Sequence, residues 1–291
     1  MRYFPTPYPD ELLGSLLIRA CHHLGLPPAS LVKVLEDGSS DLSYLYPSFF
    51  QGLSRLTNLS PSEMLLDHTV FPYAAIALPT KRRALLEREL LTATARGNSV
   101  RLRATLGLHV KDMSRRRFCK KCRAEECKEI GESYWHRLHA LPGVFVCPKH
   151  GEPLCVSGIS VLPKLSNVNA KLPQEVEGTP VEWGLDVQTL QRLAAAVLES
   201  IALPAETWND VSDEYLRYAM EIDDRNRQCC WDVQQCVVDF TRFYGDRFLD
   251  KVGLHLSSVG SDAWPARLAH GARPSPLFQL RHILLRLFLK F

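Results

Sequence analysis

Apolar residues recur at helical spacing over much of the 291-residue chain. Asp10 is suited to cap a helix; after it, leucines follow one another at intervals of three and four up to Leu24, and Gly25 supplies a stop. In the first hundred residues the same pattern predicts further helices over 28–38, 49–57, from Pro61 onward, and 81–96. We therefore expect a compact N-terminal helical domain.

The second half of the chain predicts helices over 186–200, 212–224 and 229–250, whereas residues 158–183 show no clear period. The last twelve residues are rich in leucine and phenylalanine, although chain termini are usually polar. Such an end packs into the core, docks on a partner or continues in a longer protein, and we favour the last.

The expected fold is mainly α, with short strands and turns around the central cysteines. The expected divisions are an N-terminal helical, helix-turn-helix-like domain (1–98), a small zinc-ribbon module (99–160), a connector (161–185) and a truncated C-terminal helical domain (186–291).

Two predicted helices and the turn between them have the outline of a helix-turn-helix. Ser60, with Glu63 three residues later, forms a capping box for the second helix. This helix carries Glu63 and Asp67 and neither lysine nor arginine, so it is a poor DNA reader. The pattern favours a packing or protein-docking role for this domain.

Composition narrows the class of protein. Apolar residues make up 46% and charged residues 23%, which is typical of globular domains. Nine cysteines cannot all pair in a closed disulfide framework, which favours a reducing compartment. No uncharged apolar run is long enough to span a bilayer, so we expect no membrane contact.

The net charge of +3 hides a strong segregation. Residues 81–123 hold 14 Lys and Arg against three acids, whereas residues 175–250 hold six against 16. The basic run predicts a surface that contacts DNA phosphates, while the alternative is a merely solvated face. The candidate DNA-binding residues are Lys81, Arg82, Arg83, Arg101, Arg103, Arg115, Arg116, Arg117, Lys120, Lys121 and Arg123.

Two pairs of soft ligands predict a metal site. Cys119 and Cys122 form one Cys-x-x-ligand pair, and Cys147 and His150 form the other. Together they give the Cys₃His set of structural zinc, which leaves no open position for a reacting water. Gly151 follows, where the turn favours a residue tolerant of positive φ.

Other nearby ligand types fit less well. Cys127 and Cys155 lack a Cys-x-x partner and are interpreted as core or spare thiols. His136 and His139 are possible substitute ligands, although their aromatic neighbours favour packing. No phosphate loop, nucleophile elbow or deaminase signature is present, so we expect no enzyme.

These segments resemble the TniQ/TnsD family of transposon target-selection proteins. The similar stretches are the opening 3–15, 67–73, 117–122, 131–137, 141–144 and 147–151, and a final segment at 280–285. The chain looks most like the longer TnsD type and is expected to end before that type's C-terminal portion.

The resemblance implies a non-enzymatic adaptor in the bacterial cytoplasm, associated with the nucleoid when on target. Such an adaptor binds target DNA and recruits the AAA+ ATPase TnsC and thereby the transposase. Some members bind a fixed attachment site, and others ride on an RNA-guided CRISPR Cascade complex. The family's zinc ligands carry over to Cys119, Cys122, Cys147 and His150, with a second zinc ion doubtful because Cys155 stands alone.

The resemblance also assigns the N-terminal arm, with Tyr3, Phe4 and Tyr8, to contact with the ATPase. Two alternatives remain open. One is a protein scaffold on a CRISPR effector that has no DNA affinity of its own. The other is a helix-turn-helix transcription regulator with a zinc ribbon.

Overall fold

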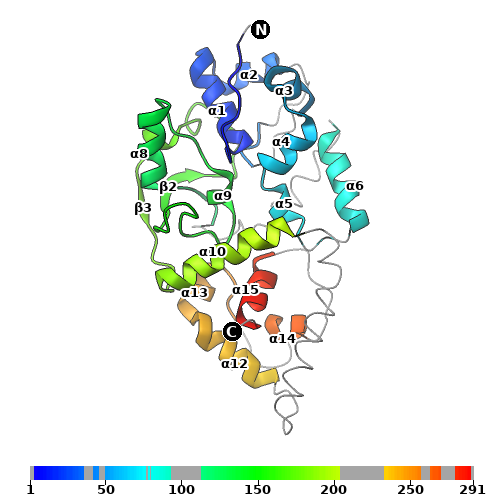
Figure 1. Cartoon of the computed structure of the whole chain (residues 1–291), viewed down its shortest axis with the longest axis vertical. Coiled ribbons are helices and arrows are strands. Elements are labelled where there is room, and N and C mark those ends of the chain that lie inside the picture. Colours follow the sequence, from blue (N-terminus) through cyan, green and yellow to red (C-terminus); the bar gives the residue numbers. More distant parts are fainter. Residues whose placement is uncertain are drawn as a thin grey trace.

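The computed structural model describes residues 3–35, 42–45, 50–76, 78, 80–92, 113–203, 233–256, 263–269 and 279–289. It is mainly helical with one three-stranded antiparallel sheet, which confirms the expected fold class. In Figure 1 helices α1–α6 form the upper part, α10 runs obliquely across the middle, and α12–α15 lie below it. No helix among these residues is long and apolar enough to cross a membrane.

Among the described residues, the N-terminal part contains α1 (Leu13–Leu24), α2 (Pro28–Val34), α3 (Phe50–Thr57), α4 (Pro61–Asp67), α5 (Phe71–Ala74) and α6 (Thr80–Leu91). Leu13, Leu16 and Leu17 of α1 are buried, as the sequence pattern predicted, and Leu24 is half-buried. Gly25 ends the helix at φ 62°. The predicted capping box of α4 is present, with Ser60 Oγ accepting from the Glu63 amide at 3.1 Å.

The predicted cap of α1 is wrong. Leu12 is the N-cap residue, and its own amide and that of Leu13 donate to backbone carbonyls of Trp135 and His68. Asp10 instead lies at φ 57°, and its carboxylate accepts hydrogen bonds from Arg137 and the Leu138 amide. The start of α1 is therefore fixed by tertiary contacts, which no local signal encodes.

The central part contains β1 (Arg115–Phe118), α8 (Lys120–Glu129), α9 (Arg137–Ala140), β2 (Cys155–Ser160), the 3₁₀ turn η1 (Pro173–Glu175) and β3 (Gly178–Pro180). The strand order is β1-β2-β3. Strand β3 and η1 lie within the stretch 161–185 that we expected to be a connector, and β3 pairs with β2. The sheet thus crosses the expected boundary at residue 160.

The C-terminal part contains α10 (Val187–Ala202), α12 (Val233–Tyr244), α13 (Asp246–Lys251), α14 (Trp264–Ala269) and α15 (Gln279–Leu289). Asp186 caps α10 through the Thr189 amide, as its position before the helix suggests. The single helix predicted over 229–250 is interrupted at Gly245, which adopts φ 74°. The helix predicted over 212–224 lies outside the described residues.

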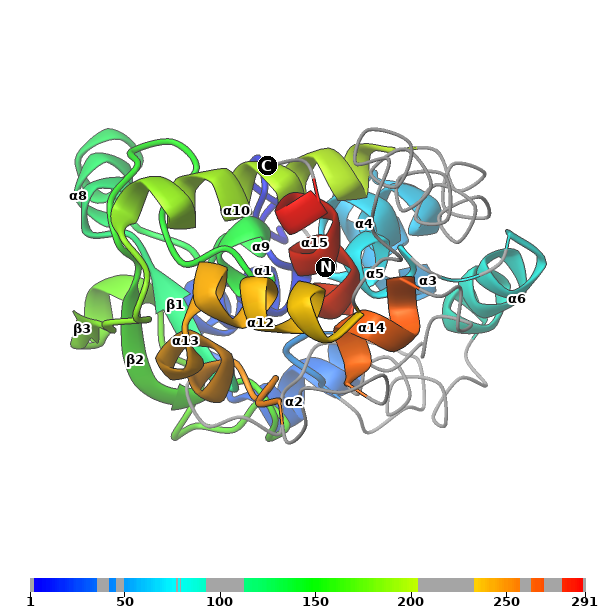
Figure 2. The ribbon, with the colours of Figure 1, turned by 90° about the horizontal axis from the view of Figure 1, so that it is seen from below.

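One cluster of buried apolar side chains extends from Phe4 to Leu285 and joins all three parts. The apolar residues of α15 belong to it: Leu280, Ile283 and Leu284 are buried, and Tyr244 donates to the Leu284 carbonyl. Helix α15 packs beneath α10 in Figure 2, where both are seen from below. Within the described residues, the leucine-rich end of the chain is therefore part of the core.

Helix α1 packs so closely on residues 42–45 that a methyl group at Gly14 has no space. A Cβ atom there would lie 2.1 Å from the carbonyl oxygen of Tyr44. Glycine to alanine in an open helix usually stabilises by about 1 kcal/mol, whereas overpacking costs about 1–3 kcal/mol.

We predict that Gly14→Ala lowers the melting temperature. The matched control is Gly158→Ala, where nothing lies within 4 Å; equal melting temperatures for the two variants would contradict the close packing.

Candidate metal centre

The four predicted ligands meet at one point between α8 and the turn before β2. Cys119 is the N-cap residue of α8 and Cys122 lies in its first turn. Cys147 and His150 lie in the turn 147–150, which closes with a hydrogen bond from the Gly151 amide to the Cys147 carbonyl. Gly151 has φ 67°, as the sequence predicted.

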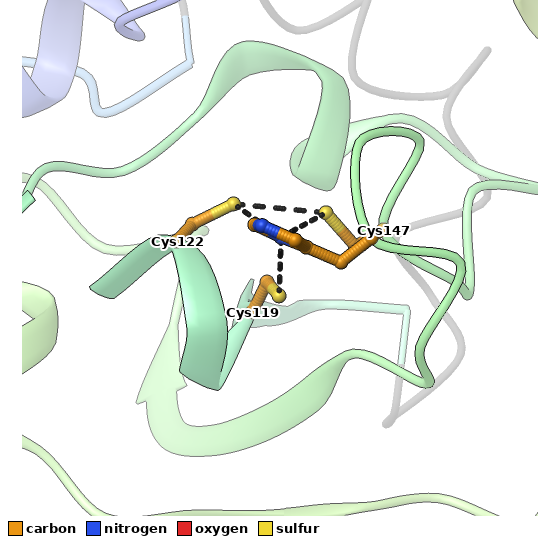
Figure 3. A group of neighbouring side chains, drawn as sticks. Cys119, Cys122 and Cys147 are labelled. Atoms are coloured by element: carbon orange, nitrogen blue, oxygen red, sulfur yellow. Dashed lines mark hydrogen bonds between the residues drawn. The ribbon is translucent and has the colours of Figure 1, made fainter. Parts of the chain in front are cut away.

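The distances between the donor atoms are those of a metal tetrahedron. His150 Nδ1 lies 3.4 Å from both Cys119 Sγ and Cys122 Sγ, and 3.6 Å from Cys147 Sγ. The sulfur atoms of Cys122 and Cys147 are 3.6 Å apart. Bonds of roughly 2.3 Å to sulfur and 2.0 Å to nitrogen require edges of about 3.5 Å between sulfur and nitrogen and about 3.8 Å between two sulfurs. Figure 3 shows Cys119, Cys122 and Cys147 pointing toward one another. Together with His150 they can hold one metal ion.

The cluster stabilises one thiolate before a metal binds. Hydrogen bonds with Cys122 and Cys147 lower the pKa of the Cys119 thiol, whereas hydrogen bonds with Cys119 raise the pKa of the Cys122 and Cys147 thiols. The N-terminus of α8 adds a partial positive charge beside it. A metal ion binds thiolates, and its binding completes the deprotonation.

Glu125 orients the histidine ligand from outside. Its carboxylate lies 3.0 Å from His150 Nε2 and 2.6 Å from Lys149 Nζ. Hydrogen bonds from Lys149 and His150 lower the pKa of Glu125, which therefore remains a carboxylate. A carboxylate on the distal nitrogen fixes the tautomer that leaves Nδ1 free for the metal. Glu125 was not predicted from the sequence, because short strands rather than the polar helix α8 were expected here.

The other nearby thiols and histidines do not contribute to this set of four. Cys155 is buried in β2 opposite Phe118, and Cys127 is half-buried on α8. His136 and His139 also lie outside the Cys₃His group. His136 pairs instead with two carboxylates, those of Asp10 and Glu126.

The structure does not bring the candidate DNA-binding residues together on one surface. Lys81 and Arg82 are exposed on α6 and Lys120 and Lys121 on α8, and these helices lie on opposite sides of the molecule in Figures 1 and 2. Arg83 and Arg115 are half-buried. Arg101 and Arg103 lie outside the described residues.

Three further arginines of this set make contacts within the protein. Arg117 is buried and donates to the carbonyls of His139 and Leu141, both at 2.9 Å. Arg116 is also buried, with its guanidinium 4.0 Å above the ring of Tyr44. Arg123 donates to two backbone carbonyls, that of Pro173 in η1 and that of Val176, which precedes β3. Arg116 and Arg117 are thus buried away from solvent, although the guanidinium nitrogens of Arg116 have no hydrogen-bond partner, and Arg123 is half-buried.

The three aromatic residues assigned to a partner lie in different environments. Tyr3 is 55% exposed, and its hydroxyl lies 2.7 Å from His23 Nδ1. Phe4 is buried in the core. Tyr8 is half-buried between the Arg19 guanidinium at 3.9 Å and the ring of Tyr134 at 5.1 Å. Of the three, Tyr3 offers most surface to a partner.

The chain is thus a mainly helical protein with a Cys₃His cluster that can hold a metal ion. The TniQ family model matches residues 2–154, more than half of the chain, so the chain belongs to the TniQ family. The chain is also similar to the transposon Tn7 transposition protein TnsD of Escherichia coli, at 30% identity over 157 residues. That match covers 52% of this chain and 31% of the relative, so the chain spans less than a third of the relative's length.

We predict that Cys147→Ser removes the metal from the Cys₃His site and lowers the melting temperature sharply, because structural zinc sites couple metal binding to folding. Metal content by mass spectrometry and thermal unfolding by circular dichroism measure both effects. The control is Cys155→Ser, which alters a buried thiol of the same module and should keep the metal. A Cys147→Ser protein with the wild-type melting temperature would show that the cluster does not support the fold.

Proposed function

We propose that this chain is a target-selection adaptor for DNA transposition, which contacts target DNA and recruits the AAA+ ATPase TnsC and thereby the transposase. The observation that carries the proposal is the match to the TniQ family over residues 2–154, a range that includes all four metal ligands. Similarity to a Tn7 transposition protein supports the same role.

The metal in this proposal is one zinc ion with a structural role. Three sulfur donors and one imidazole favour zinc over magnesium or calcium. With four protein ligands the ion has no open coordination position, so it supplies no activated water. We therefore propose an adaptor without catalytic activity that works in the bacterial cytoplasm.

DNA contact is assigned to the exposed lysines and arginine rather than to the whole basic run. One patch, on α8, consists of Lys120 and Lys121, and the other, on α6, consists of Lys81 and Arg82. Lys121 also pairs with Glu152 at 2.7 Å, an exposed ion pair that contributes little stability. Both patches present exposed cations, which suits contacts with phosphates that do not depend on sequence.

The second helix of the helix-turn-helix outline has a different role in the proposal. Met64 and Leu65 of α4 are buried, and Glu63 is engaged in the capping box. These features favour packing over base recognition and weigh against the transcription regulator. The exposed Tyr3 on the N-terminal arm is our candidate contact for the ATPase.

We predict that Lys120→Ala with Lys121→Ala weakens binding to a random DNA duplex and lowers the slope of log affinity against log salt by about one to two, since each phosphate contact contributes about 0.9. Fluorescence anisotropy at several salt concentrations measures both. The matched control is Arg242→Ala, an exposed arginine of α12 far from both patches, which should leave the slope unchanged.

The same experiment with Lys81→Ala and Arg82→Ala tests the patch on α6. If the wild-type protein binds no duplex even at low salt, the DNA contact is excluded and the scaffold on a CRISPR effector becomes the better account. If the protein binds but none of the lysine variants differs from Arg242→Ala, the patches are only solvated surfaces.

A further inference from the structure

A second group of potential metal ligands lies directly beside the Cys₃His cluster. One donor atom from each of Cys122, Glu126 and His136 falls within 4.8 Å of the other two. Cys122 and Glu126 are four residues apart on α8 and share one face of that helix. His136 approaches from the segment that leads into α9. The Cys122 sulfur thus belongs to both groups.

The two carboxylates around His136 give it the orientation of a metal ligand. Nδ1 lies 3.4 Å from Asp10 Oδ2, whereas Nε2 and Glu126 Oε1 are hydrogen-bonded at 2.6 Å. This pair must open to about 3.3 Å when a zinc ion binds both atoms. A histidine that binds a metal with one nitrogen usually meets a carboxylate with the other. Glu126 is itself held in place, because its second oxygen accepts from the Tyr134 amide at 3.3 Å.

The charges around the group favour a cation. The carboxylates of Asp10 and Glu126 flank the His136 imidazole, one at each ring nitrogen.

A fourth position is available in an open cavity of about 400 Å³ that Cys122, Glu126, His136 and His139 line together. His139 is buried, its ring centroid lies 4.6 Å from that of His136, and its Nδ1 has no hydrogen-bond partner. An unsatisfied buried nitrogen is costly. A metal-bound water, or the metal itself, would satisfy it.

We propose that Cys122, Glu126 and His136 bind a second zinc ion, which shares the Cys122 sulfur with the first. One sulfur, one imidazole nitrogen and one carboxylate oxygen form a donor set that zinc accepts. The ion joins α8 to the segment before α9 and, through Asp10, to the N-terminal arm. This inference does not depend on the DNA-targeting role.

The test is equilibrium dialysis of the purified protein against buffered zinc, followed by metal analysis. Wild-type protein is expected to hold two ions per chain, and Glu126→Gln and His136→Gln one each. The matched control is Glu129→Gln, which changes a carboxylate on the same helix and cavity and should keep two. Circular dichroism establishes that the variants are folded.

A wild-type protein that saturates at one ion overturns the inference and leaves the first site intact, whereas none at all contradicts both sites. Retention of two ions by both Glu126→Gln and His136→Gln also overturns it.

Cobalt supplies a readout that needs no variant. Because a shared thiolate couples the spins of two cobalt ions, the electron paramagnetic resonance signal should rise until one equivalent of cobalt has been added and fall as the second equivalent binds. A signal that doubles at two equivalents would exclude the shared sulfur.

Discussion

The convergence of two short ligand pairs on one point is the constraint on which the central module depends. Helix α8 is polar on nearly every side, and Cys122 is its one buried residue. Such a helix has no apolar stripe with which to pack against a core. Its attachment relies on the ligands at its first turn and on Arg123, which reaches the carbonyls before β3. In our proposal a metal ion takes the place that hydrophobic burial has in the other helices.

The same region shows why the charge of a segment does not define a surface. Along the sequence, Arg115 to Lys121 form one dense basic cluster. In the structure, the arginines of β1 turn into the protein, where Arg117 satisfies backbone carbonyls and Arg116 lies over aromatic rings. The lysines that follow, on α8, face solvent. A strand that is covered by neighbouring elements buries its charges, and a polar helix exposes them.

Much of the fold could be predicted from local patterns. Leucine spacing gave α1 and α10, the Ser60–Glu63 box gave the start of α4, and the two ligand pairs gave the cluster. What local patterns missed depends on contacts between distant segments. The carbonyls of Trp135 and His68 begin α1, and β3 forms because β2 offers an edge to a stretch without any period of its own.

Glu125 and Glu126, the carboxylates beside the candidate metal site, were also not predicted, because their positions depend on the fold. Glu125 and Glu126 look like ordinary surface acids until α8 is known to be a helix, because only helical spacing places them on the face of Cys122. His136 acquires its two carboxylate partners from segments that lie far apart in sequence. The ligand types could be identified from the sequence, but their surroundings required the fold.

The central claim is that one ion bound by three sulfurs and one nitrogen organises this TniQ-family chain. X-ray absorption at the zinc edge, on protein loaded with a single equivalent of zinc, tests this claim directly. The account predicts a shell of three sulfur atoms at about 2.3 Å and one nitrogen at about 2.0 Å. A shell of oxygen and nitrogen alone, or with a single sulfur, would contradict it.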